Sequence, residues 1–432
     1  MINTNGKMEG KYMTNSEKVI QAIQSGNLEE VDEWIQLALD EDDEETLYLL
    51  GNSLYQLGFL EETKKVYNHL IDINPQDDEL KIYLAEIEIE EGNELEALEL
   101  LHSIENTSSS YTQSLLVQAD YYHLNGLPEV SIQKLEEAEE LIPQEPVIKF
   151  ALAEVYFTIA EYQLAVNYYE FLIEEGLEEI AGTLINARLG NAYLMLGNYE
   201  KAIENLNEAL SFKDDPEVYY QLGFAYIQKE EFYQAIDTLK QAKEMDPSLI
   251  SVYILLAEAY QQLNDLEQSL QTIEEGLTVN EMNIELYLKA AEYAGKLNIN
   301  EKASNFYHEA LDIEPENERI LLRYAEFLNH LDQYEEIIEL FEKAPESVRS
   351  LPEALWLLAT TNNELDEYDQ ARDYFDQAYN ELNDHLDFLK DYAFFLREDG
   401  QREKMHEVLE RYTSINPEYD EEIASLKEDY LY

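Results

Sequence analysis

Small residues recur along this chain at a nearly constant spacing of 34 residues. The steps between eleven of them are 34, 34, 34, 37 and 33 residues, and then 34 residues five times. Every one of these positions holds Gly or Ala: Gly51, Ala85, Ala119, Ala153, Gly190, Gly223, Ala257, Ala291, Ala325, Ala359 and Ala393. A period of this length is typical of a solenoid, in which each unit buries its apolar face by stacking on its neighbours. One structural unit is therefore expected to repeat along nearly the whole chain.

The residues of one copy, 216–249, predict two antiparallel helices. Its first apolar stripe, at helical spacing, consists of Tyr219, Leu222, Gly223 and Tyr226. Its second stripe consists of Ala235, Leu239 and Ala242. Pro247 follows the second stripe, where it cannot prolong a helix. The small residues let the two helices of a unit approach closely, since helices pack at roughly 8–10 Å depending on the side chains between them.

The pattern resembles the tetratricopeptide repeat (TPR), in which a Gly or Ala, an aromatic residue, a second small residue, a bulky apolar residue and a final Pro recur within 34 residues. The aromatic position holds Tyr122, Tyr156, Tyr193, Tyr226 and Tyr260, and the final Pro recurs at Pro75, Pro143, Pro247, Pro315 and Pro417. The match covers roughly residues 43–417. The resemblance implies an all-α TPR superhelical solenoid of about eleven to twelve helix-turn-helix repeats with a C-terminal capping helix. Length, acidity and the absence of cysteine make the chain similar to the YpiA-type proteins of low-GC Gram-positive bacteria.

The repeats divide the chain into expected segments. These are a disordered tail at 1–11, a degenerate N-terminal capping repeat at 12–43, one TPR block at 44–178, a second at 179–417, and a capping helix at 418–432. Ile423 and Leu426 are expected to face inward on that last helix. The block boundary follows the single step of 37 residues, whose three extra residues lie between Glu174 and Gly182. They form either a longer loop or a hinge between the blocks.

Charge limits the partners that such a chain can bind. It carries 94 acidic and 28 basic side chains, for a net charge of −66. Part of this charge solvates a large surface, and the rest repels nucleic acids and anionic membranes and attracts basic proteins. No apolar stretch has the length of a signal core or a membrane span, and there is no cysteine for disulfides. We therefore expect a cytoplasmic protein that binds basic segments of partner proteins, and neither nucleic acid nor membrane.

The resemblance also implies where a partner binds, because TPR first helices line a concave groove with their second, fifth, ninth and twelfth residues. The ninth position holds two acidic ladders, which comprise Glu86, Asp120 and Glu154 and then Glu258, Glu292 and Glu326. Aromatic residues at the fifth, ninth and twelfth positions are further candidates: Tyr48, Phe150, Phe157, Tyr220, Phe224 and Trp356. Stacked carboxylates repel one another unless something basic binds, and exposed aromatics favour recognition. A ligand with basic residues along an apolar stripe is expected, as extended peptide or helix.

A carboxylate clamp for chain termini is not expected, because the only lysine at a fifth position, Lys390, has Phe394 at the ninth. Catalytic and metal-binding motifs are absent as well. The seven histidines have no ligand spacing, and there is no phosphate-binding glycine loop. The acidic run at 40–45 lacks the glycine turn of a calcium loop. We expect no cofactor, no metal and no small-molecule substrate.

Two functional classes follow from these observations. The first is a non-catalytic scaffold or adaptor that holds protein partners in an acidic groove. The second is a peptide-sensing regulator that changes its superhelical pitch when a ligand binds. An enzyme would need a catalytic domain for which the repeats leave no room. Regulators of this kind usually join the array to an effector domain, and none is recognisable before Ser16 or after Pro417, which favours the scaffold.

Overall fold

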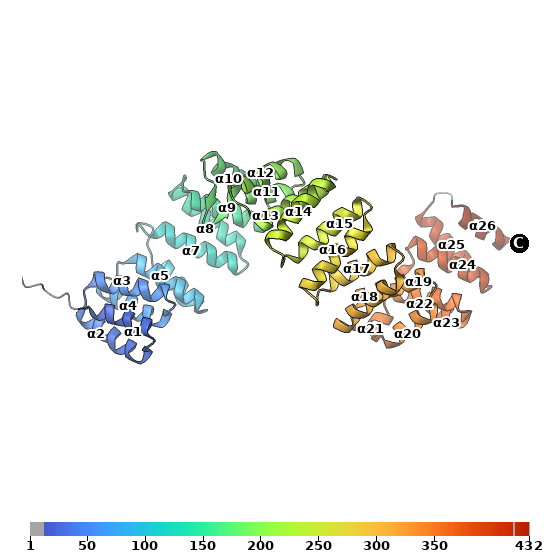
Figure 1. Cartoon of the computed structure of the whole chain (residues 1–432), viewed down its shortest axis with the longest axis horizontal. Helices are drawn as coiled ribbons and strands as arrows, with labels where there is room; N and C mark the ends of the chain where they lie inside the picture. Colours follow the sequence, from blue (N-terminus) through green and yellow to red (C-terminus); the bar gives the residue numbers. More distant parts are fainter. Residues whose placement is uncertain (1–12, 418–419, 432) are drawn as a thin grey trace, which may run out of the picture. The chain divides into compact units, whose positions relative to one another are not determined.

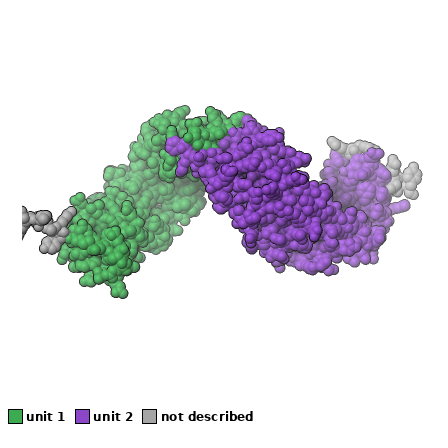
Figure 2. All heavy atoms as spheres, in the orientation of Figure 1, with its two compact units in different colours: residues 1–211 green, residues 212–432 purple. Residues whose placement is uncertain are grey.

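The computed structural model describes residues 13–417 and 420–431. Helices follow one another along the whole of this described part (Figure 1). The chain divides into two compact units, residues 1–211 and 212–432 (Figure 2). The predicted all-α repeat fold is confirmed. The expected disordered tail, and residues 418, 419 and 432 of the expected capping helix, lie outside the described residues.

Unit 1 contains twelve helices, one 3₁₀ turn and one small hairpin among its described residues. They are α1 (Asn15–Ser25), η1 (Leu28–Glu30), α2 (Val31–Glu41), α3 (Glu44–Gln56), α4 (Leu60–Ile73), α5 (Asp78–Glu90), α6 (Glu94–His102), α7 (Tyr111–Leu124), α8 (Pro128–Leu141), α9 (Pro146–Thr158), α10 (Tyr162–Glu174), β1 (Glu179–Ile180), β2 (Thr183–Leu184), α11 (Ile185–Met195) and α12 (Tyr199–Phe212).

Unit 2 continues the same alternation through its described residues. Its helices are α13 (Pro216–Gln228), α14 (Phe232–Met245), α15 (Ile250–Gln262), α16 (Leu266–Val279), α17 (Ile284–Lys296), α18 (Asn300–Ile313), α19 (Glu318–His330), α20 (Tyr334–Lys343), α21 (Glu346–Arg349), α22 (Pro352–Glu364), α23 (Tyr368–Leu382), α24 (Leu386–Glu398), α25 (Arg402–Ile415) and α26 (Glu421–Leu431). The odd-numbered helices from α3 to α19, then α22 and α24, carry the small residues of the 34-residue period.

A left-handed residue ends the first helix of every repeat, seven positions after the small residue. These residues are Gly58, Gly92, Gly126, Ala160, Gly197, Glu230, Asn264, Asn298, Asp332, Asp366 and Gly400. The next residue donates its N–H to a carbonyl five positions back, as Leu127 does to Tyr122 and Glu231 to Tyr226. This is the Schellman arrangement, which satisfies the last carbonyls of a helix and reverses the chain. The recurrent turn therefore sets each second helix against its first.

The small residues lie where the two helices of a repeat cross, as predicted. A Cβ atom on Gly223 would lie 2.5 Å from Cγ of Leu239, and one on Gly51 would lie 2.3 Å from Cε1 of Tyr67. Ala153, Ala291 and most other alanines of this series are completely buried. The close approach of the paired helices thus depends on side chains no larger than a methyl group.

The ends of the array bury apolar residues on weaker versions of the same pattern. Val19 on α1 and Val31, Ile35 and Ala38 on α2 are buried against α3 and α4. At the other end, Ile423 and Leu426 of α26 are 4% and 0% exposed and pack against the cluster of α24 and α25. Both flanking elements therefore cover apolar surface that the terminal repeats would otherwise leave open.

The irregular step of 37 residues contains a short antiparallel hairpin. Strands β1 and β2 pair Glu179 with Leu184 and Ile180 with Thr183. Ala181 and Gly182 form the turn with positive φ angles of 49° and 83°. The hairpin lies inside unit 1, whereas the boundary between the compact units falls after Ser211. The connection that holds the extra residues thus contains a hydrogen-bonded hairpin, and a hinge at this place stays a prediction.

Candidate functional site

The acids at the ninth position of the first helices have different surroundings along the chain. In unit 1 they lie on α5, α7 and α9. Glu154 is 3.0 Å from Arg188 of α11, and the Tyr169 hydroxyl donates to its carboxylate at 2.5 Å. Within the described part of the chain, Glu86 and Asp120 form neither an ion pair nor a side-chain hydrogen bond. Two of the three acids of the first ladder therefore have no partner of their own.

The electrostatics of Glu86 and Asp120 follow from that isolation. Burial raises the pKa of the Glu86 carboxyl, and the negative charges of Glu90 and Asp120 raise it further. Asp120 is an exposed residue, yet the protein around its carboxyl displaces enough water to raise its pKa, and the nearby His123 offsets part of this effect. The ionised form of both carboxylates is thus destabilised in the folded chain.

The second ladder, in unit 2, does not have the unrelieved repulsion expected from the sequence. Glu258 lies 3.1 Å from Lys289, Glu292 lies 2.6 Å from Lys296, and Glu326 lies 3.2 Å from Arg323. Side chains of the protein's own helices α17 and α19 supply all three cations. Each acid of this ladder thus already has a basic neighbour from the chain itself, and its part in partner binding stays a prediction.

The sequence carried a signal for these pairs that the expectation missed. Arg188, Lys289 and Arg323 each lie two residues before the small residue of their repeat, in a row beside the fifth position. From that row Arg188 and Lys289 reach back to the ninth-position acid of the preceding repeat, whereas Arg323 binds the acid of its own helix. The fifth, ninth and twelfth positions alone do not include this basic row.

The six candidate aromatics are partly buried, and most contact other side chains of the chain. In unit 1, the Tyr48 hydroxyl donates to Glu79 at 3.1 Å, and the rings of Phe150 and Phe157 pack edge-on against Tyr169 and Tyr162. In unit 2, the indole N–H of Trp356 donates to Asp391 at 3.0 Å, and its ring lies edge-on to Phe388.

Tyr220 packs against the core of α14 and α15, and Phe224 is partly buried one turn further along α13. The candidate aromatics therefore line the first-helix face without standing free of it. Lys390, the lysine considered for a carboxylate clamp, is paired with Asp420 and Glu422.

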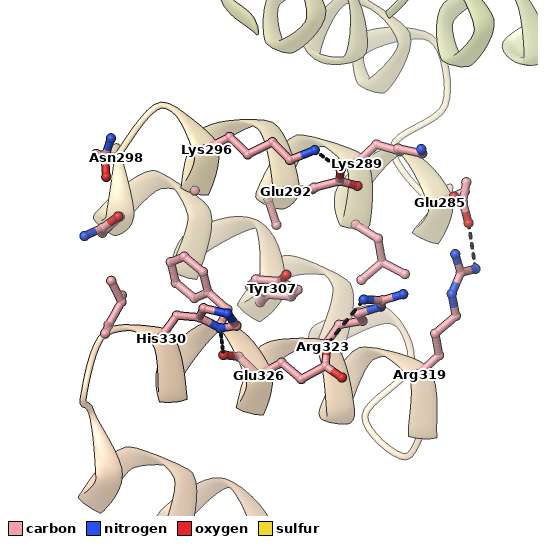
Figure 3. Close-up of a pocket in the computed structure, with 16 residues that line it drawn as sticks. Glu285, Lys289, Glu292, Lys296, Asn298, Tyr307, Arg319, Arg323, Glu326 and His330 are labelled. Carbon is pink, nitrogen blue, oxygen red and sulfur yellow. Dashed lines mark hydrogen bonds and ion pairs between the residues drawn. The ribbon is translucent and has the colours of Figure 1, made fainter. Parts of the chain in front are cut away.

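A pocket of about 600 Å³ lies between α17 and α19 in unit 2 (Figure 3). Four cationic side chains line it, from Lys289, Lys296, Arg319 and Arg323, against three carboxylates, from Glu285, Glu292 and Glu326. Figure 3 shows Tyr307 of α18 between the side chains of α17 and those of α19. Each of the four cations is paired with one carboxylate, and the partner of Lys289 is Glu258, so this surface is close to neutral in a chain with a net charge of −66. From the sequence an acidic groove was expected along this stretch, and the four lysine and arginine side chains that balance its acids were not anticipated.

Neither a membrane span nor a metal site is found among the described residues. No helix within residues 13–417 and 420–431 combines the length and the apolar content needed to cross a bilayer. Across those ranges, no three His, Asp or Glu side chains gather closely enough to hold a metal ion.

Family models match segments in both units. They are the models for YpiA-like C-terminal tetratricopeptide repeats at residues 352–419, for YpiA-like tetratricopeptide repeats at 124–177, for the TPR repeat at 190–229, and for the tetratricopeptide repeat at 44–77, 216–249 and 250–281. Together these matches cover more than half of the chain.

Individual proteins share part of the sequence. The TPR repeat-containing protein YpiA of Bacillus subtilis (strain 168) is 34% identical over 237 residues, or 55% of this chain and 56% of that protein. The TPR repeat-containing protein MJ1428 of Methanocaldococcus jannaschii is 25% identical over 199 residues, or 43% of this chain and 34% of that protein. The matched regions thus span about half of YpiA and a third of MJ1428.

Among solved structures, PilF of Pseudomonas aeruginosa aligns with a TM-score of 0.41 and 20% identity, over 51% of this chain and 97% of that one. The repeats seen in the sequence, the paired helices and the matched family models agree. Tetratricopeptide repeats serve as protein-interaction scaffolds, and the chain belongs to the tetratricopeptide-repeat family.

Proposed function

We propose that this chain is a non-catalytic, cytoplasmic scaffold that binds basic, partly apolar segments of partner proteins on the first-helix face of unit 1. The observation that carries the proposal is the pair of acids on α5 and α7, Glu86 and Asp120, which have no partner among the described residues. The remaining ladder acids are neutralised by the protein's own cations and are not assigned to the site.

The charge balance at these acids favours a cationic ligand. Glu86 is close enough to Glu90 and Asp120 for their charges to raise its pKa, so the folded chain holds like charges together. A Lys or Arg from a partner would relieve that repulsion and form charge-assisted hydrogen bonds, which are about twice as strong as neutral ones. Binding energy that the free protein cannot obtain is thus available to a basic partner.

Aromatic side chains beside the acids favour the same kind of ligand. Burial raises the pKa of Tyr55 on α3, and the negative charges of Glu86 and Glu90 raise it further. The charge of Glu86 also contributes to the raised pKa of Tyr83 on α5, after burial and the contact with Glu79. The hydroxyls of Tyr48 and Tyr83 both donate to Glu79, which holds these two rings in place. Ring faces attract cations, and partly buried rings supply apolar contact area for the stem of a lysine or for a neighbouring leucine.

Binding of a defined probe tests the proposal. A short fluorescein-labelled peptide of alternating Lys and Leu, blocked at both ends, is titrated with the full chain in about 0.15 M NaCl. The double variant Glu86→Gln/Asp120→Asn is expected to bind it about tenfold more weakly, the effect of losing one charge-assisted interaction.

The matched control is Glu292→Gln/Glu326→Gln, which removes the same charge from acids that already have cationic partners. It is expected to bind the basic peptide within about twofold of the wild-type chain, since distant charges are screened at this ionic strength. Equal affinity for the two double variants, or no binding by the wild-type chain, would contradict the proposed site.

A further inference from the structure

We propose that the pocket between α17 and α19 binds an acidic segment of a partner protein through the side-chain carboxylates of that segment. This site goes beyond the proposed function in unit 1, because it offers guanidinium and hydroxyl donors where the first site offers carboxylates. Cationic residues are scarce, at 28 in 432 positions, yet four of the sixteen residues that line this pocket are Lys or Arg. Such enrichment in a chain of net charge −66 has to act against the surrounding field.

The arginines of the pocket already bind carboxylates in a partial way. Arg319 donates from Nη1 to the Glu285 carboxylate at 2.7 Å, and Arg323 donates from Nη1 to the Glu326 carboxylate at 3.2 Å. Both guanidinium side chains remain about 60% exposed, at 59% and 63%. A guanidinium has five N–H donors, so each retains donors for a second carboxylate.

A structural arginine in the same unit shows what full engagement looks like. Arg372 donates to the Asp399 carboxylate from Nε at 2.7 Å and from Nη2 at 2.5 Å, and the Asp399 side chain is 6% exposed. This bidentate ion pair joins α23 to the C-terminal end of α24. The single contacts of Arg319 and Arg323 lack this geometry, so the two arginines are held toward the pocket without being saturated.

The hydroxyl of a largely buried tyrosine, Tyr307, adds a neutral donor. Tyr67 and Tyr169 occupy the same place in their repeats as Tyr307, sixteen residues after the small residue, and they donate to the ninth-position residues Asn52 and Glu154. In the repeat of Tyr307 the ninth-position acid, Glu292, pairs with Lys296 instead of with the tyrosine hydroxyl. Tyr307 is only 6% exposed, lines the pocket, and makes no hydrogen bond with any described residue.

The chemistry of these groups fits an acidic peptide. Burial raises the pKa of Tyr307 to about 12, so its hydroxyl keeps its proton at neutral pH and can donate. The volume of about 600 Å³ lies within the usual range of ligand pockets, about 300–1,000 Å³. Glu285 and Glu326 stand as internal substitutes for the ligand, since each places a carboxylate on one of the two arginines.

The test uses a short fluorescein-labelled peptide of alternating Glu and Leu with both ends blocked, so that it carries no terminal carboxylate. Binding to the full chain is measured by fluorescence anisotropy in about 0.15 M NaCl. Arg319→Gln/Arg323→Gln is expected to weaken binding about tenfold or more, and Tyr307→Phe about two- to tenfold. The Phe variant loses no hydrogen bond within the described chain, so its melting temperature serves as the check on folding.

A gain of affinity separates this site from a merely structural role. Glu292→Gln/Glu326→Gln removes the internal competitors of Lys296 and Arg323 and is expected to bind the acidic peptide about two- to fivefold more tightly, the value of exposed ion pairs. Lys65→Gln/Lys343→Gln removes two cations whose partners, Asp32 and Glu339, lie outside the pocket, and should change the affinity by less than about twofold.

Wild-type affinity in Arg319→Gln/Arg323→Gln, failure of the wild-type chain to bind, or equal binding of a Gln and Leu peptide would overturn the assignment. A chain that binds inorganic phosphate but does not bind the Glu and Leu peptide would overturn the assignment as well. The basic probe and the Glu86 and Asp120 variant report on unit 1 separately, so that either site can fail without the other.

Discussion

Two of the eleven left-handed turn positions hold residues that this backbone conformation disfavours. Ala160 has a φ of 63° and Glu230 a φ of 61°, where five other repeats have Gly and four have Asn or Asp. A Cβ atom in this region costs roughly 1–2 kcal/mol, whereas glycine adds about 0.4–1 kcal/mol of entropy to the unfolded chain. Steric strain is the larger of the two effects.

We therefore expect Ala160→Gly to raise the free energy of unfolding by about 0.5 kcal/mol. The reciprocal change, Gly126→Ala, should lower it by a similar amount. No atom lies within 4 Å of the Cβ position on Gly126, so backbone strain is the only cost. Urea midpoints of the two variants measure the effect, and a less stable Ala160→Gly chain would show that the turn does not hold this conformation in solution.

The raised pKa values of Glu86 and Asp120 make stability depend on pH. A carboxyl whose pKa is higher in the folded state than in the unfolded state binds protons more tightly when folded. Its ionised form therefore weakens the fold at neutral pH, and the penalty disappears as the pH falls through the folded pKa toward the ordinary value. Glu86→Gln/Asp120→Asn is expected to be more stable than the wild-type chain by about 0.5 kcal/mol at neutral pH, the scale of like-charge pairs one helical turn apart.

The difference between these two proteins should shrink as the pH falls from about 7 to about 4, because protonation then relieves the wild-type chain. Comparison with a variant removes the contribution of other carboxyls, such as Asp78, whose pKa is lowered and whose effect on stability has the opposite sign. A difference that is constant with pH would contradict the raised pKa values. Gain of stability with loss of basic-peptide binding would identify these acids as retained for function.

At the scale of a helix pair, the crossing point of α13 and α14 offers a sharp test of the packing. Leu239 is fully buried, and a Cβ atom on Gly223 would lie 2.5 and 2.6 Å from its Cγ and Cδ2 atoms. Gly223→Leu should lower the free energy of unfolding by about 3 kcal/mol or more, at the upper end of overpacking costs. Gly223→Ala is the graded control, since other repeats hold Ala here and the better helix propensity, about 1 kcal/mol, offsets part of the clash.

Thermal melts of these two variants decide the point. An unchanged melt for Gly223→Leu would mean that the residue faces solvent and that the register of the repeats is shifted. An Ala variant as damaging as the Leu variant would mean that α13 and α14 cannot separate by even a few tenths of an ångström.

The same helix pairs explain what the sequence could predict about the fold. The period, the paired helices and the small residue at each crossing leave a local trace at fixed spacing, so the amino-acid sequence alone sufficed to assign Gly223 and Ala235 to the helix crossing. The left-handed turn did not emerge because Ala160 and Glu230 conceal a position that glycine marks elsewhere. The β1 and β2 hairpin was visible only as three extra residues, since two-residue strands have no periodicity of their own.

At the scale of the whole chain, the sequence located acids more readily than it located their partners. The ninth position predicts which face of α15 carries Glu258. It does not predict that Lys289 on α17 reaches across to pair with that acid. Which cation neutralises which acid depends on side-chain reach and rotamer. The two unpaired acids of unit 1 and the lysine- and arginine-lined pocket of unit 2 can therefore be identified only once the positions of neighbouring helices are known.

The large net negative charge of the chain should make its thermal stability depend on salt. With 94 acidic and 28 basic residues, mutual repulsion acts against compact folding, while the ion pairs of the surface contribute only about 0–1 kcal/mol each. Both effects weaken as NaCl is added, and the excess of acids makes repulsion the larger. Between low salt and about 0.5 M NaCl we expect Tm to rise by about 2–4 °C, the shift that 1 kcal/mol produces in a unit of roughly 200 residues.

Binding should respond to the same salt in the opposite direction, because attraction between a charged probe and its site is screened while the fold is relieved of repulsion. Both the basic and the acidic peptide are expected to dissociate more readily as Tm rises. Chloride is used because sulfate also strengthens apolar burial and would raise Tm for another reason. A Tm that falls with NaCl would mean that the surface ion pairs stabilise the fold by more than the general repulsion destabilises it. The acids of this chain would then act first as structural partners of its few cations.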